Sequence, residues 1–64
     1  MKTLYDSEAD ALYVRFAAAK VVESEEVAPG VMLDFDEEGR IVGVEVLEAR
    51  RHLAEGAELP SAAE

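Results

Sequence analysis

No cysteine occurs among the 64 residues of the chain, so disulfide bonds and thiolate metal sites are excluded. A chain of this length forms one domain and buries only about 60 % of the surface that its unfolded form exposes, which makes a single hydrophobic core marginal. Domains this small usually need a disulfide, a metal ion or oligomerisation to be stable. With the disulfide excluded, a site for a hard cation, a second copy of the chain or very economical packing remain, and we favour the homodimer.

Basic residues are also scarce, because 6 Lys and Arg stand against 15 Asp and Glu, for a net charge of −9. Nucleic acids and anionic membranes both attract Lys and Arg, so we expect neither as a partner. The electrostatic complement of this chain is a basic protein or a cation. An acidic surface also serves simply to keep a small domain soluble, and both interpretations stay open.

Long apolar runs are missing as well, since no stretch approaches the roughly 18 residues of a membrane-spanning helix. Residues 1–6 become acidic too early for a secretory signal peptide. We therefore expect a cytoplasmic protein. Asn and Gln are absent too, a bias that is typical of thermophile proteins and that a GC-rich genome also produces.

Apolar and polar residues alternate along most of the chain, which predicts strands. Residues 2–6 and 11–16 flank a polar loop and predict a first hairpin. Tyr5 and Tyr13 are expected to pair across it. Residues 21–27 predict a short edge strand with a charged outer side.

The clearest pattern is a second hairpin between residues 31 and 47. Its two strands share one apolar face only if the loop between them is even-numbered, because a slip of one residue turns every side chain over. We therefore predict a two-residue turn at Glu38-Gly39, with Gly43 beside Asp34 on the opposite face. The shared face would hold Val31, Leu33, Phe35, Val42, Val44 and Val46. The opposite face is itself partly apolar and needs a cover, which again favours a homodimer.

Residues 48–55 predict a helix of about two turns that ends at Gly56, because Arg51 and His52 suit the C-terminal end of the helix dipole. Residues 57–64 lack periodicity and are expected to form a disordered tail. The predicted fold is therefore α+β and mainly β. An antiparallel sheet of two β-hairpins, with three to four strands, carries a short C-terminal helix in one compact domain over residues 1–56.

Residues 34–45 match the spacing of an EF-hand calcium loop. Asp34, Asp36, Glu38 and Glu45 would supply oxygen ligands, and Gly39 would stand at the sixth position. An EF-hand loop lies between two helices, whereas this stretch alternates with the period of two strands. The hairpin is therefore the preferred interpretation.

Asp6, Glu8 and Asp10 form a second cluster of carboxylates, which could gather oxygens around Mg²⁺ or Ca²⁺. More often, Asp in a short loop accepts backbone N–H bonds and sets the turn.

His52 could act as a general acid or base with Glu48, although a lone histidine near the end of a helix is commonly a solvated residue. No serine has a nucleophile context, and no glycine-rich phosphate loop occurs. We therefore predict no catalytic residue and no cofactor. The predicted function is a non-catalytic, homodimeric interaction module with a basic partner, and the alternative is a divalent-cation-binding protein.

Two stretches, YDSEADALYV at residues 5–14 and VMLDFDEEGRIVGVEV at residues 31–46, resemble a known family. It is domain-of-unknown-function family 2283, a set of small prokaryotic proteins, and the similarity runs from Met1 to about Leu53. Glu48 departs from the pattern, because the family often has Asp there, a better helix cap. The resemblance implies a compact β-rich fold and assigns no activity or catalytic residue. It also implies an antitoxin-type role, because members are suspected of pairing with small toxin-like proteins.

Overall fold

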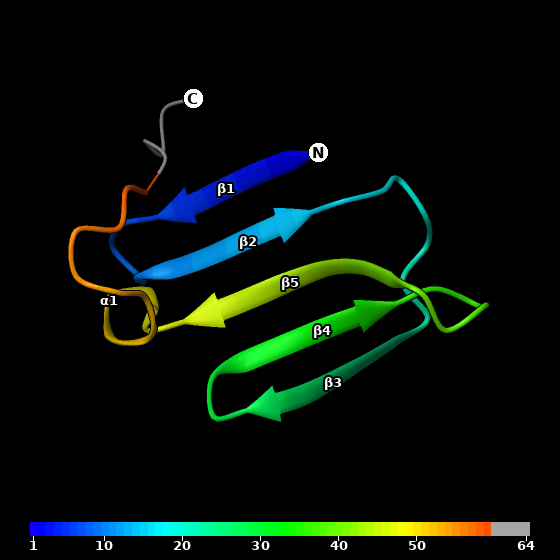
Figure 1. Ribbon diagram of the computed structural model, residues 1–64. Helices are drawn as coiled ribbons and strands as arrows, with labels where there is room; N and C mark the ends of the chain where they lie inside the picture. Colours follow the sequence, from blue (N-terminus) through cyan, green and yellow to red (C-terminus); the bar gives the residue numbers. More distant parts are fainter. Residues whose placement is uncertain (60–64) are drawn as a thin grey trace.

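The computed structural model describes residues 1–59, which form one antiparallel sheet with a single helical turn at its end (Figure 1). In chain order the elements are β1 (Lys2–Asp6), β2 (Ala11–Arg15), β3 (Glu23–Ala28), β4 (Val31–Phe35), β5 (Ile41–Leu47) and α1 (Ala49–His52). The order across the sheet is β1-β2-β5-β4-β3, so the connection after β2 crosses to the far edge and the chain winds back strand by strand. The predicted α+β, mainly β fold is confirmed. The sheet has five strands rather than the predicted three to four, because both β1 and the charged segment β3 pair into it along their length.

The remaining expectations about chain organisation concern the C-terminal part. Of the predicted tail at 57–64, residues 60–64 lie outside the described residues, and residues 57–59 belong to no helix or strand. No helix found between residues 1 and 59 has the length and apolar character needed to cross a bilayer.

The turn between β4 and β5 differs from the predicted two-residue turn at Glu38-Gly39. The N–H of Asp36 bonds the carbonyl of Arg40 at 2.9 Å, and the N–H of Gly39 bonds the carbonyl of Asp36 at 3.0 Å. The loop between the last paired residues therefore holds three residues, 37–39. Gly39 has a φ of 77°, the left-handed conformation that closes a three-residue hairpin loop and that glycine adopts without steric cost.

A β-bulge restores the predicted faces despite this odd-numbered loop. With three loop residues alone, Asp34 would lie opposite Val42. The register instead shifts between Asp34 and Phe35, so that Phe35 pairs with Ile41 and Asp34 pairs with Gly43. One extra residue on β5 thus compensates for the odd loop. The apolar pairs Leu33 with Val44 and Val31 with Val46 form as predicted.

Gly43 lies where β2 approaches β5 closely. A Cβ at this position would be 2.8 Å from the Val14 carbonyl oxygen and 2.8 Å from the Tyr13 hydroxyl. Tyr13 crosses over Gly43 because its hydroxyl donates to Asp34 Oδ2 at 3.1 Å, while the Ser24 hydroxyl donates to Asp34 Oδ1 at 2.6 Å. Desolvation, followed by the bond to the Asp34 carboxylate, raises the pKa of Tyr13. Three strands are tied together by this polar contact.

The predicted cross-strand pair of Tyr5 and Tyr13 is wrong. Tyr5 lies opposite Leu12, and Tyr13 lies opposite Leu4. The reason is the register of the first hairpin, in which a four-residue loop at 7–10 pairs Asp6 with Ala11. The two tyrosines therefore point to opposite faces of the sheet.

The helical turn α1 is capped by the loop between β1 and β2. The Asp10 carbonyl accepts the Ala49 N–H at 2.8 Å, and the Asp10 carboxylate accepts the Arg50 N–H at 3.2 Å. The Tyr5 hydroxyl donates to the same carboxylate at 2.6 Å. Glu48 precedes the helix with a φ of 51° and makes no side-chain cap bond, so Asp10 takes over the capping role.

The prediction of two helical turns over 48–55 is wrong in length. Helix α1 is one turn long, and the chain becomes extended at Leu53. A helix this short does not propagate by itself, because nucleation is costly and few hydrogen bonds repay it. Its position depends on tertiary contacts such as the one with Asp10.

Replacing Asp10 tests the cap. D10A is expected to lower the melting temperature by roughly 5 °C at pH 7, as loss of a cap does in a small domain. The bond from Tyr5, with a smaller contribution from Arg50, holds the pKa of the Asp10 carboxyl below its usual range. Its contribution is therefore complete above the unfolded pKa of about 4 and is lost as the pH falls through the lower native pKa.

Thermal unfolding followed by circular dichroism between pH 7 and pH 2 measures both effects. Wild type should lose more stability than D10A as the medium is acidified, so that their melting temperatures converge. E8A, an exposed change in the same loop, serves as the control. Parallel curves for D10A and wild type would contradict the assigned cap.

Replacing Gly43 tests the close approach of β2. G43A should reduce the free energy of unfolding by about 1–3 kcal/mol, because the new methyl group meets backbone that cannot move aside easily. Urea unfolding at a fixed protein concentration measures the change. E45A, on the same strand and the same face, should stay within about 0.5 kcal/mol of wild type. Equal midpoints for the two variants would rule the close approach out.

Candidate functional site

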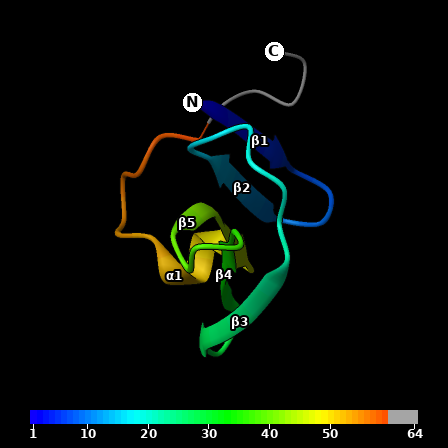
Figure 2. The same cartoon turned by 90° about the vertical axis from the view of Figure 1, so that its right-hand side faces the viewer.

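One face of the sheet carries most of its apolar side chains, and we call it the open face. The register aligns its residues across four strands: Tyr5 on β1, Leu12 and Val14 on β2, Val44 and Val46 on β5, and Val31, Leu33 and Phe35 on β4. The other side, here called the outer face, carries Lys2, Leu4, Asp6, Tyr13, Arg15, Met32, Asp34 and Glu45. The described residues form one sheet layer, with α1 at the end of β5 (Figures 1 and 2).

The open face is only partly covered. Within residues 1–59 the buried hydrophobic side chains are those of Tyr5, Val42 and Ala49, which are 6 %, 1 % and 0 % exposed. Tyr5 is buried because α1 lies beside it, with Arg50 Cζ 5.8 Å from the ring centroid. The other residues of the open face are only half-buried. Protein domains normally pack two layers around a core, and this chain supplies one.

The accessible surface of the chain exceeds that of a compact monomer of the same mass. The accessible surface is 4738 Å². A compact monomer of 7.0 kDa exposes about 4000 Å². The surplus of about 700 Å² indicates an open shape, to which the single-layered sheet and residues 53–59, which belong to no helix or strand, both contribute. The face that the alternating pattern predicts to lie in the core therefore stays partly accessible to solvent in the single chain.

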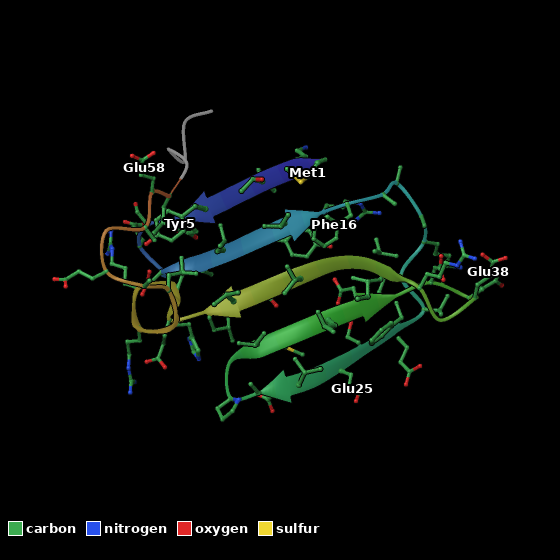
Figure 3. The ribbon with its side chains drawn as sticks, viewed as in Figure 1. Met1, Tyr5, Phe16, Glu25, Glu38 and Glu58 are labelled. Atoms are coloured by element: carbon green, nitrogen blue, oxygen red, sulfur yellow. The ribbon has the colours of Figure 1, made fainter. Side chains whose placement is uncertain are left out.

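Charged residues border the open face without entering its centre. Glu25 lies opposite Leu33, and Glu23 lies opposite Phe35, both on the edge strand β3. Every residue of β3 is exposed. Figure 3 shows Glu25 along this edge and Glu38 at the tip of the β4–β5 turn. The open face is therefore apolar in the middle and acidic along one side.

Two residues of the calcium-loop match, Asp34 and Asp36, accept hydrogen bonds from other groups of the chain. Asp34 accepts the hydroxyls of Tyr13 and Ser24 on the outer face. Asp36 Oδ1 accepts the backbone N–H groups of Glu38 and Arg40, each at 2.9 Å. This is the bonding by which an aspartate sets a turn. Two of the matched carboxylates thus organise a hairpin and a cross-strand contact.

Two members of the cluster of Asp6, Glu8 and Asp10, namely Asp6 and Asp10, are likewise used by the fold. Asp6 Oδ1 accepts the N–H of Glu8 at 3.0 Å and that of Ala9 at 3.3 Å. Asp10 faces Tyr5 and α1. In the part of the chain from 1 to 59, no three His, Asp or Glu side chains are grouped so that they could hold a metal ion.

His52 connects α1 to the turn between β3 and β4. Its Nε2 lies 2.8 Å from the Pro29 carbonyl oxygen, and its Nδ1 lies 3.2 Å from the Glu48 carbonyl oxygen. The ring covers Gly30, where a Cβ would be 3.1 Å from His52 Cε1. The Glu48 carboxylate, the expected acid–base partner of His52, pairs instead with Arg51 at 3.3 Å. His52 therefore joins α1 to the β3–β4 turn, which is a structural role.

Comparison with known proteins identifies the family. The family model for a "Protein of unknown function (DUF2283)" matches residues 2–50, which include all five strands. Searches of curated proteins and of solved structures found no match. The resemblance carried by residues 5–14 and 31–46 is confirmed, and the chain belongs to the DUF2283 family of proteins of unknown function.

Proposed function

We propose that this protein is a non-catalytic protein-interaction module that acts as a homodimer through its open face. The observation that supports this most directly is the single-layered sheet, whose apolar side is only half-buried in the single chain. A chain with three buried hydrophobic residues among those described lacks the core that a small domain needs, and a second layer would supply it.

A second copy of the chain fits this role. Two sheets packed face to face bury their apolar sides in a sandwich, and a two-fold axis lets the same patch serve both copies. Self-association of a chain with a charge of −9 requires that the charges stay out of the contact. The centre of the open face satisfies this condition, because its charged neighbours Glu23 and Glu25 lie on the edge strand.

The finer part of the proposal is a basic, toxin-like partner that binds the acidic edge of the dimer. Glu23, Glu25 and Glu26 lie close together along the exposed strand β3, with Ser24 between the first two. Such a row attracts a positively charged surface and accelerates its association.

Divalent-cation binding receives less support, because the Oδ1 atoms of Asp6 and Asp36 already accept two backbone N–H bonds each. Heat released on titration with Ca²⁺ or Mg²⁺ would favour that alternative.

A charge placed on the open face tests the dimer. L33K should weaken self-association by at least about 100-fold, because an unpaired ammonium group would be buried in the contact. M32K is the matched control, since Met32 is the neighbouring half-buried residue on the outer face. Sedimentation and light scattering over a concentration series give the masses. If L33K and M32K associate alike, the open face is not the contact.

Neutralising the acidic edge tests the basic partner. Changing Glu23, Glu25 and Glu26 together to Gln should weaken binding of a lysine-rich peptide about tenfold at low salt, at roughly 0.5 kcal/mol for each exposed charge. The control changes Glu8, Glu37 and Glu38 to Gln, which removes the same charge elsewhere. Calorimetric titration measures both affinities. Equal losses in the two triple variants would contradict a role for β3.

A further inference from the structure

The two edges of the sheet differ in how well they resist the addition of another strand. Edge strand β3 carries three glutamates and a register shift between Glu26 and Ala28, and Pro29 follows it. Charge, bulges and proline are the means by which proteins block pairing at a sheet edge. Edge strand β1 pairs with β2 over all five residues without a register shift. In the region 1–59, no backbone hydrogen bond reaches the edge of β1 that faces away from β2.

We propose that β1 pairs in antiparallel orientation with β1 of a second copy, centred on Leu4. In this register Lys2 lies opposite Asp6 of the second copy, Thr3 lies opposite Tyr5, and Leu4 lies opposite Leu4. The strand carries opposite charges at its two ends, so antiparallel self-pairing creates two ion pairs. Parallel pairing would instead bring like charges together, and a slip of one residue would mix the two faces.

The surroundings of Lys2 in the single chain support this register. Lys2 lies opposite Arg15, and like charges directly opposite each other are destabilising. The Arg15 guanidinium group turns away to donate to the carbonyls of Ala17 at 2.9 Å and Ala19 at 2.8 Å. Leu4, on the same face between the two charges of β1, is 46 % exposed. The proposed pairing covers this side chain and gives each Lys2 a carboxylate.

Asp6 can take part without giving up its turn. Its Oδ1 accepts the N–H groups of Glu8 and Ala9, and these bonds leave Oδ2 for the ammonium group of the second copy. The carboxylate would then serve the loop and the contact at once.

The edge contact uses different residues from the open-face contact, so either can exist without the other. Directly opposite residues of paired strands share a face. Edge pairing therefore places the open faces of two copies on the same side of one continuous sheet. With both contacts formed, two face-packed dimers join edge to edge into a tetramer with perpendicular two-fold axes.

A charge reversal tests the register. K2E places a carboxylate opposite Asp6 and should weaken the edge contact by about tenfold or more, since two ion pairs become two repulsions. The double variant K2E with D6K restores opposite charges and should recover the wild-type mass. K20E, the same charge change on the β2–β3 connection, should have no effect. Folded K2E that associates like wild type, or a folded double variant that does not recover, overturns the proposal.

Cross-linking provides a second test that does not depend on Asp6. The chain has no cysteine, and directly opposite residues of antiparallel strands lie about 4.5–5.5 Å apart, within reach of a disulfide. L4C should therefore form an intermolecular disulfide under mild oxidation. V27C is the matched control, because Val27 is 50 % exposed on the other edge strand, and it should stay uncross-linked. Equal yields for L4C and V27C overturn the edge contact.

The L33K variant separates the two contacts. If both exist, L33K should be a dimer that L4C still cross-links. A monomeric L33K, with no cross-link through L4C, means that the edge contact fails while the open-face dimer stands. An L33K variant with the mass of wild type, efficiently cross-linked through L4C, means that the open-face contact fails while the edge contact stands.

Discussion

The register between β4 and β5 decides which side chains meet on each face of the sheet. A loop of three residues would by itself bring Asp34 opposite Val42 and mix polar with apolar residues. The inserted residue of the bulge shifts the pairing back, so that Asp34 meets Gly43. Strand β2 continues the same alignment, with Leu12 opposite Val46. One extra residue in β5 therefore gathers the apolar side chains of four strands on one face.

The polar contacts of the fold depend on this arrangement. Tyr13 reaches Asp34 only because Gly43 leaves room between β2 and β4. At the end of the sheet, Asp10 combines a bond from Tyr5 with two backbone N–H groups of α1. Carboxylates that could serve as metal ligands in isolation are thus committed to donors of the chain itself.

A sheet of one layer has consequences for function. Burial of its apolar side would contribute favourable free energy to the proposed association, because burial of apolar surface drives most protein association. Its acidic groups lie at the edge and in the loops, where they influence the choice and orientation of partners more than the strength of binding. The proposed interaction module would use both kinds of surface.

The sequence by itself determined the positions of the strands and the composition of the two faces, because alternation with period two is a local property that each strand carries. The stretches at residues 5–14 and 31–46 also indicated the family. It also indicated that one chain has too little core. The two-residue turn, the two-turn helix and the Tyr5–Tyr13 pair were mispredicted, since each depends on how segments meet. Only the tertiary structure decided that Asp10 caps a helix 40 residues away, that a bulge corrects the register, and that the apolar face remains half-buried. These features arise from contacts between distant residues, and hydrophobic pattern and local propensity carry no information about which distant group will satisfy a backbone N–H.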